Sequence, residues 1–305
     1  MTIISTQQRL PCTRRRRTMA AWAGLLLASV VTNPVASEAG RGHLAVNLRS
    51  DFIGAGSVGF DLVDVASIAV LDTLPNGMKG VFWLGNGYNT ECSWRLSDQE
   101  VVEHVEALKN HPRFSGIYYI SDEPHPARCS DAAERVTART NLIRGIDPEA
   151  KTFIIVQNSS SDRTEFEQLK DAADFIGVAP YPCNIKNADK GCDYDAIGRR
   201  IDEALAAGIS ARRIVPVFQL FGQDCAATGT PYYRLPSLQE LERMLAIWDE
   251  RVPPTVRPFD MAYSWGVQER TACPALSQAD GSSYPALRET FAKYIASRFT
   301  RFDEE

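Results

Sequence analysis

Short apolar runs alternate with amphipathic helical patterns along most of the chain, and this alternation constrains the fold more than any other feature. Most of the runs are continuously apolar, as expected of parallel strands that are covered on both faces. Strands that alternate with helices in this way are typical of βα units. The predicted strands cover residues 58–63, 80–84, 116–121, 152–156, 175–179, 214–220 and 259–265, and residues 44–48 supply a candidate eighth strand.

Several of the intervening helices carry their own start and stop signals. Ser97 with Glu100, and Ser237 with Glu240, form capping boxes ahead of helical apolar patterns. Three more helices are predicted, one from Asp131 to near Gly145, one capped by Asp193 and ending at Gly208, and one opened by Pro285.

The regular repeat favours a closed (β/α)8 TIM-type barrel, allowing for one irregular or missing unit. The competing architecture is an open, doubly wound α/β sheet. No glycine-rich phosphate loop follows the first predicted strand, and the repeat continues to the end of the chain. The same absence argues against a nucleotide cofactor, and we expect no cofactor at all.

The first 39 residues are predicted to be a signal peptide and not part of the fold. Arg14 to Arg17 form a basic cluster, Met19 to Val31 form an uncharged run of 13 residues, and Ser37-Glu38-Ala39 is a small-residue cleavage pattern. A span of the bilayer needs roughly 20 apolar residues, so we expect cleavage and no lasting membrane anchor. Residues 40–305 then form a single secreted domain, and both Sec and twin-arginine export stay open.

The charge of the mature chain bears on its partners. The whole sequence has 33 Lys and Arg against 38 Asp and Glu, and residues 1–39 hold five arginines and one glutamate, which leaves 28 against 37 and a net charge of −9. An acidic chain of this kind is a poor partner for nucleic acid. We expect a monomer.

Six cysteines remain after Cys12 leaves with the signal peptide, and an even number in an exported chain predicts three disulfides. Because neighbouring loops of a barrel lie close together, cysteines that are near in sequence are the expected partners. The predicted pairs are Cys92 with Cys129, Cys183 with Cys192, and Cys225 with Cys273. A thiol metal site or a nucleophilic thiol is disfavoured because His125 is the only histidine near any of them.

The densest candidate site follows the strand at 116–121, where Asp122, Glu123 and His125 come in quick succession. In a barrel of this type the site lies where the strands end. A carboxyl group in a partly dry cleft can hold its proton at neutral pH and give it to a leaving group, which is the task of the acid in glycoside hydrolysis. Successive strand residues face opposite ways, so we expect one carboxylate to act and the other to support it.

Amides and aromatic rings follow the other predicted strands. Such a lining suits a sugar, because hydroxyl groups need amide or carboxylate partners and the apolar face of the ring stacks on aromatic side chains. The candidate substrate-binding residues are Asn86, His125, Gln157, Tyr181, Gln219 and Trp265, and Trp83 and Tyr119 are expected in the barrel core.

The order of four short motifs resembles that of secreted bacterial glycoside-hydrolase-like barrel proteins. The motifs are Tyr119-Ile120-Ser121-Asp122-Glu123-Pro124, Ala179-Pro180-Tyr181-Pro182-Cys183, Val217-Phe218-Gln219 and Tyr263-Ser264-Trp265-Gly266. Barrel glycosidases more broadly carry an Asn-Glu-Pro strand end with the acid/base glutamate and a tryptophan on the last strand. The resemblance therefore implies that Glu123 is the acid/base and that Trp265 is a stacking platform, with Asp122 in place of the asparagine.

One departure from that pattern concerns the second carboxylate, which retaining glycosidases of this group place at a late strand end. This sequence has Gln219 there. The remaining candidates for the second carboxylate are Asp61, Asp64, Asp224 and Glu269. Inverting and substrate-assisted mechanisms do not need a nucleophile at that position.

Two functions of different kinds follow from these features. The first is a secreted glycosidase that acts on a polysaccharide or glycan, with Glu123 as general acid and Asp122 as its neighbour. The second is a barrel that lost its nucleophile and binds carbohydrate without cleaving it. A metal site formed by Asp122, Glu123 and His125 is disfavoured, because three ligands within four residues lack the spread of zinc sites.

Overall fold

The computed structural model of this protein describes residues 42–156, 164–225, 227 and 231–299. The predicted signal peptide, residues 1–39, lies outside the described residues. The described residues belong to the compact unit Glu38–Glu305.

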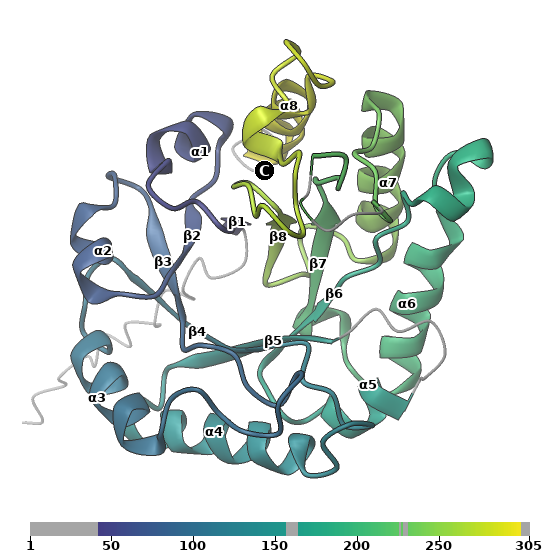
Figure 1. Cartoon of the computed structure of the whole chain (residues 1–305). Helices are drawn as coiled ribbons and strands as arrows, with labels where there is room; N and C mark the ends of the chain where they lie inside the picture. The colour runs from purple at the N-terminus through teal and green to yellow at the C-terminus, as the bar shows by residue number, and fades with distance from the viewer. Residues whose placement is uncertain (1–41, 157–163, 226, 228–230, 300–305) are drawn as a thin grey trace, which may run out of the picture. The chain divides into compact units, whose positions relative to one another are not determined.

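Eight parallel strands in the described part of the chain close into a barrel, with neighbours in sequence also neighbours in space. Helices surround the strands (Figure 1). The strands are β1 (Gly42–Ala45), β2 (Leu62–Val65), β3 (Lys79–Trp83), β4 (Phe114–Asp122), β5 (Lys151–Val156), β6 (Phe175–Val178), β7 (Ile214–Gln219) and β8 (Phe259–Tyr263). The predicted (β/α)8 barrel is therefore confirmed.

The helices follow the strands in turn. They are α1 (Phe52–Val58), α2 (Ile68–Thr73), α3 (Asp98–Leu108), α4 (Ala132–Ile146), α5 (Thr164–Leu169), α6 (Asp195–Ala206), α7 (Leu238–Arg251) and α8 (Leu287–Phe299), with 3-10 turns η1 (Ile185–Lys190), η2 (Ala211–Arg213) and η3 (Leu276–Gln278). Both predicted capping boxes are present, at the starts of α3 and α7.

The candidate strand at the amino end closes the barrel. Leu44 of β1 pairs with Leu62 of β2 on one side and with Met261 of β8 on the other. No barrel unit is missing, although α2 and α5 have only six residues each.

The prediction of a strand at residues 58–63 was wrong in its boundaries. Val58 ends helix α1, and β2 begins only at Leu62. The side chain of Asp51 accepts a hydrogen bond from the backbone N–H of Gly54, and Gly59 ends the helix with φ of 107°. A side-chain cap and a left-handed glycine thus define a short helix ahead of β2.

The prediction that Asp193 caps a helix was also wrong. The residue before α6 is Tyr194, which makes no side-chain cap. The Asp193 carboxylate instead pairs with Arg199, at 2.7 Å.

The apolar core has two layers because successive strand residues face opposite sides. Phe153 and Ile155 of β5 point into the barrel, whereas Ile154 and Val156 pack against the helices. The barrel interior is thus filled with side chains, and space for a ligand is confined to the mouth at the carboxyl ends of the strands.

All three predicted disulfides are present, with Cα–Cα distances of 5.3, 4.3 and 5.0 Å for Cys92–Cys129, Cys183–Cys192 and Cys225–Cys273. Every one of these cysteines lies in a connection from a strand to the next helix. The disulfides therefore fasten the loops around the mouth of the barrel.

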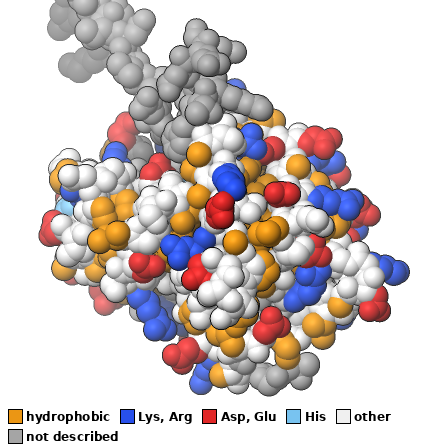
Figure 2. All heavy atoms as spheres, turned by 90° about the horizontal axis from the view of Figure 1, so that it is seen from above, with side chains coloured by type: hydrophobic (Ala, Val, Ile, Leu, Met, Phe, Trp, Pro, Cys, Tyr) orange, Lys and Arg blue, Asp and Glu red, His pale blue; other side chains and the backbone are white. Residues whose placement is uncertain are grey.

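The outer surface mixes both signs of charge. On the face that carries α8, acidic and basic side chains alternate with apolar ones, and no extended basic area is visible (Figure 2). Among the residues that the structure describes, no helix has the length and apolar character to cross a membrane.

Candidate active site

The carboxyl end of β4 presents Asp122 toward the barrel axis through an irregularity in the strand. The register against β5 shifts between Tyr119 and Ser121. Tyr119 and Asp122 consequently face the same side, and the Tyr119 hydroxyl donates a hydrogen bond of 2.8 Å to Asp122 Oδ1. This bond fixes the orientation of the Asp122 carboxylate.

Glu123 adopts a left-handed backbone conformation with φ of 55°, which is uncommon for a residue other than glycine. Its backbone N–H donates to the carbonyl of Ile155 on β5, at 3.0 Å. Because the chain turns here, Glu123 lines the same cavity as Asp122. Residues that follow each other in an extended strand face different ways, but the strand ends at Asp122, so both carboxylates reach one cavity.

A cavity of about 550 Å³ occupies the mouth of the barrel and receives both carboxylates. Residues from both halves of the barrel line it. Its aromatic lining consists of Trp83, Tyr119, Tyr181, Phe221, Tyr233 and Tyr263, its polar lining of Asn47, Asp64, Asp122, Glu123, Gln223, Gln268 and Thr271, and its aliphatic lining of Val46, Ile155 and Met261. Rings, amides and carboxylates thus converge on one space.

Burial changes the acidity of all three carboxyl groups in this cavity. It raises the pKa of Glu123 to about 7, with further contributions from the negative charges of Asp122 and Glu165. Burial also raises the pKa of Asp122, against the opposing effect of the Tyr119 hydrogen bond. Glu123 can therefore carry a proton near neutral pH.

The third carboxylate is Asp64, in β2. Burial raises its pKa to about 6, although hydrogen bonds from the backbone N–H groups of Asn47 and Leu48 act in the opposite direction. The bond from Asn47 measures 2.9 Å to Asp64 Oδ1. Asp64 therefore loses its proton at a lower pH than Glu123, which separates a candidate base from a candidate acid.

Several solved structures have a fold similar to that of this chain. A β-galactosidase from Bacillus circulans sp. alkalophilus matches with a TM-score of 0.61 at 8% identity, over 85% of this chain and 56% of that chain. A glycoside hydrolase-like protein matches with a TM-score of 0.54 at 12% identity, over 85% of this chain and 94% of that one. The GH18 chitinase ChiB of Flavobacterium johnsoniae matches with a TM-score of 0.51 at 9% identity, over 84% and 94%. The chain shares the barrel fold of these proteins.

The likeness to these structures is one of fold. No known protein family matches the sequence, and no curated protein matches it. The chain spans just over half the length of the β-galactosidase. The expected resemblance to glycoside-hydrolase-like barrels is confirmed at the level of the fold.

The geometry of the closed barrel distinguishes among the four candidates for the second carboxylate. Only Asp64, among them, lines the described cavity. Asp61 lies before β2, at the opposite end of the barrel, where it accepts a hydrogen bond from the backbone N–H of His43 at 2.7 Å. Asp224 and Glu269 are exposed on loops.

The other predicted site residues divide into those at the cavity and those that support it. Tyr181 lines the cavity. Asn86 accepts a hydrogen bond of 3.1 Å from the backbone N–H of Asp122, so it holds the strand end in place. His125 Nδ1 lies 3.2 Å from Glu165 Oε1. Gln157 lies outside the described residues.

Two of the predicted binding residues are buried away from the cavity. Trp265 is 0% exposed, and its indole N–H donates to Asp51 Oδ2 at 3.1 Å. Gln219 is 1% exposed and bonds the backbone N–H and carbonyl of Cys183, at 2.8 and 2.9 Å. In this structure Trp265 packs in the core and Gln219 holds the loop after β6, which leaves neither side chain facing a ligand.

A hydrogen-bonded group of residues at the cavity was missed by the sequence analysis. Gln268 Nε2 donates to Asn47 Oδ1 at 2.7 Å, and the hydroxyls of Tyr263 and Thr271 donate to Gln268 Oε1 at 2.7 and 2.6 Å. Asn47 is the one polar residue of the candidate eighth strand, residues 44–48, and this was the one signal that pointed to it. The network joins the loops after β1 and β8 across the point where the barrel closes.

The disfavoured metal site finds no support in the geometry. Among the described residues, Asp122, Glu123 and His125 do not bring three ligand atoms within 4.8 Å of one another. The one such group in that part of the chain contains Cys183 and Cys192, which form a disulfide.

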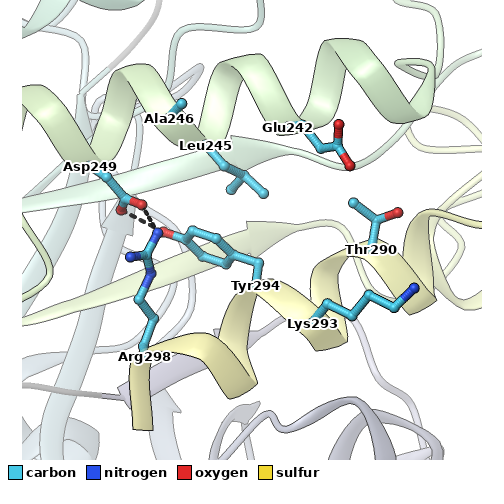
Figure 3. A pocket seen from close by; sticks show the side chains of 8 residues that line it. All are labelled: Glu242, Leu245, Ala246, Asp249, Thr290, Lys293, Tyr294 and Arg298. Atoms are coloured by element: carbon cyan, nitrogen blue, oxygen red, sulfur yellow. Dashed lines mark hydrogen bonds and ion pairs between the residues drawn. The ribbon is translucent and has the colours of Figure 1, made fainter. Parts of the chain in front are cut away.

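A separate cavity of about 330 Å³ lies between α7 and α8 (Figure 3). The Asp249 carboxylate at its edge accepts a hydrogen bond of 2.8 Å from the Tyr294 hydroxyl and pairs with Arg298. Since these groups bond one another across the two helices, we interpret this cavity as a gap in the packing of α7 against α8.

Proposed function

We propose that this protein is a glycoside hydrolase that acts on a polysaccharide or glycan, with Glu123 as its general acid. The observation that carries the proposal is the position of Glu123, at a barrel strand end, in a cavity, with its pKa raised to about 7. A carboxyl group that holds its proton near neutral pH can give it to the glycosidic oxygen as the bond to the anomeric carbon breaks. Asp122 acts as the neighbour that keeps this proton in place.

Asp64 is the second carboxylate of the proposed mechanism. With a pKa of about 6 it is mostly ionised at neutral pH and can accept a proton from water. That water attacks the anomeric carbon on the face opposite the leaving group, which inverts the configuration of the sugar. Gln219 supports this choice, because β7 ends on an amide that bonds the backbone of Cys183 and offers no nucleophile to the cavity.

The cavity lining supports a sugar as the ligand. Trp83, Tyr181 and Tyr263 offer ring faces, and Asn47, Gln223 and Gln268 offer amide groups for hydroxyls. The catalytic groups proposed are side chains of the protein itself, and the proposed reaction uses no cofactor.

The disulfides support action outside the cytoplasm. The three disulfides are compatible with an extracellular protein. We propose that residues 1–39 direct export and are then removed, and that residues 40–305 act as a single monomeric barrel domain without a lasting membrane anchor.

The test is a screen of the purified protein, with its disulfides intact, against a panel of polysaccharides. Reducing ends and the bound fraction are measured together for the wild type, Glu123→Gln and, as a matched control, Glu250→Gln on the exposed side of α7. We expect new reducing ends from the wild type and the control, and a loss of at least about a hundredfold in Glu123→Gln. Equal turnover by Glu123→Gln would contradict the assignment.

A second function has one specific observation in its favour, namely that the end of β7 carries Gln219 and no carboxylate. This second function is that of a barrel that binds carbohydrate without cleaving it. Equal binding by the wild type and by Glu123→Gln, with no product from either, is the result that favours this function.

A further inference from the structure

Two smaller cavities adjoin the central cavity, on opposite sides of the barrel mouth. One, of about 260 Å³, shares Asn47, Asp64 and Gln268 with the central cavity. The other, of about 310 Å³, shares Tyr181 and Tyr233 with it. Shared lining residues mean that each smaller cavity lies directly beside the central one.

The first flanking cavity lies over β1 and β2. Besides the shared residues, Arg49, Phe52 and Val70 from the α1 and α2 region line it, together with Ala66. Asp64 is one of the three residues that line both this cavity and the central one, so its carboxylate lies at the boundary between them.

The second flanking cavity lies beyond β6, between the loop that precedes α6 and the loop that precedes α7. The backbone N–H of Ile185 donates to the carbonyl of Tyr232 at 2.9 Å, so the two loops are joined. Asn184, Lys186 and Asn187 supply polar groups to this cavity. In an eight-stranded barrel, β2 and β6 lie opposite each other, and the two flanking cavities therefore lie across the mouth from each other.

A row of four tyrosines leads from the central cavity into the second flanking cavity. The ring centroid of Tyr181 lies 5.8 Å from that of Tyr263 and 5.5 Å from that of Tyr233, and the rings of Tyr233 and Tyr232 are 4.8 Å apart. Tyr232, at the outer end, is 37% exposed. Aromatic side chains in a row offer successive apolar surfaces to the sugar rings of a chain.

We infer that the three cavities form one groove across the barrel mouth, which holds a glycan chain of several sugars and places an internal bond beside Glu123. This inference rests on the proposed function and extends it to endo action on a chain. A site for a single terminal sugar needs a closed end, whereas here a further cavity lies beside the central cavity on each side.

The charges of the central cavity indicate a neutral sugar at the bond that is cleaved. Asp64, Asp122 and Glu123 gather in the central cavity. A uronic acid or sulfated sugar at that position brings another negative charge beside three carboxyl groups, which is unfavourable in a partly buried site. We therefore expect neutral hexose or N-acetylhexosamine chains to bind and polyuronate chains to be excluded.

The first test measures binding by the inactive Glu123→Gln protein. The probes are chito-, cello- and galacto-oligosaccharides of two to six sugars, with oligogalacturonate as the charged comparison. We expect the affinity in one neutral series to rise with each added sugar until the flanking cavities are filled. Affinity that is independent of length in all three neutral series, or tighter binding of oligogalacturonate, overturns the inference.

The second test removes the outer tyrosine. Tyr232→Ala in the same protein is expected to weaken binding of the longest oligosaccharide about three- to tenfold and to leave the shortest one unchanged. Tyr232→Phe keeps the ring and is expected to bind normally. Leu205→Ala is the matched control, because Leu205 is 40% exposed on α6. An equal loss for short and long chains contradicts the groove.

The third test fills the first flanking cavity, at the other end of the proposed groove. Ala66 is exposed and lines the first flanking cavity, so Ala66→Trp is expected to block it. Ala69→Trp, on the exposed side of α2, is the control. This test uses variants that keep Glu123 and a hexasaccharide labelled at one end. The first products are expected to be shorter oligosaccharides from cleavage of an internal bond, and Ala66→Trp is expected to change their lengths. Release of single terminal sugars by every variant overturns endo action.

These measurements separate the two proposals. Length-dependent binding without any product from the wild type contradicts hydrolysis and leaves the groove supported. Hydrolysis without any effect of length, Tyr232 or Ala66 contradicts the groove and leaves the assignment of Glu123 standing.

Discussion

Glu123 combines an uncommon backbone conformation with a buried carboxyl group. A left-handed residue other than glycine costs on the order of 1–3 kcal/mol and persists only where its surroundings hold it. Here the hydrogen bond from its backbone N–H to Ile155 and the bonds around Asp122 hold the turn. The same turn places Glu123 in the cavity, where burial and then the negative charge of Asp122 raise its pKa.

The proposed roles of Asp64 and Glu123 predict a bell-shaped dependence of kcat/KM on pH. Below a pH of about 6 Asp64 gains a proton and cannot accept one from water, and above a pH of about 7 Glu123 loses the proton that it must donate. The optimum is therefore expected between these two values. Initial rates across the pH range check this, and activity that rises steadily to pH 9 would contradict it.

Asp122→Asn tests the influence of one carboxylate on the other. Burial is the main cause of the raised pKa of Glu123, and the negative charge of Asp122 adds to it. Removing that charge is expected to lower the pKa of Glu123, so the alkaline limb of the kcat/KM profile moves to lower pH while the acid limb stays. Asp171→Asn, at an exposed position, is the control. An alkaline limb that stays in place or moves to higher pH contradicts this coupling.

At the scale of the elements, the loops after the strands carry the site and are fastened to one another. Cys225–Cys273 joins the loop after β7 to the loop after β8. These loops supply Gln223 and Thr271 to the cavity, and Gln223 Nε2 donates to the carbonyl of Thr271 at 3.2 Å. The disulfide therefore holds two parts of the cavity wall together.

Replacing both Cys225 and Cys273 by serine is expected to lower the free energy of unfolding by about 2–4 kcal/mol, because the unfolded chain loses a cross-link. We also expect kcat/KM to fall, since Gln223 and Thr271 lose their shared support. Urea denaturation and rate measurements check the two effects. Denaturation of the wild type in reductant is the control and should show at least the same loss of stability. An unchanged kcat/KM in the double variant would contradict the supporting role of this disulfide at the site.

At the scale of the whole molecule, one end of the barrel carries the proposed site and the other contributes to stability. The proposed site occupies the carboxyl ends of the strands, and a layer of buried charges occupies the amino ends. Asp260 lies 2.8 Å from His43 Nδ1 and 2.8 Å from Arg257 Nη2, and Arg257 Nη1 lies 3.2 Å from Asp249. Although burial acts to raise it, His43 and Arg257 hold the pKa of Asp260 below its ordinary value.

Arg257→Met is expected to lower the free energy of unfolding by about 3–5 kcal/mol, because it removes a cation shared by two largely buried carboxylates. The pH dependence of kcat/KM is expected to stay unchanged, since this layer lies at the end of the barrel away from Glu123. Thermal or urea unfolding and a pH profile check both points. Arg212→Met, at an exposed position, is the control, and a destabilisation no larger than that of the control would contradict the stabilising role of the layer.

The sequence by itself determined the features that arise from neighbouring residues. Apolar runs of strand length, separated by helices with capping boxes, were enough to predict the barrel. The three disulfides followed because loops that are adjacent in a barrel are adjacent in sequence order. Asp122 and Glu123 could be located because a polar pair directly follows an apolar strand.

Only the tertiary structure decided which side chains face the cavity. The shift in β4 and the turn at Glu123 depend on hydrogen bonds to β5, which no local pattern records. Trp265 and Gln219 are placed by contacts with distant parts of the chain, Asp51 and Cys183, and so they lie in the core and not at the cavity. Asp64 stood out among four carboxylates because burial and orientation are properties of the closed barrel, whereas the sequence shows only that each is an acid.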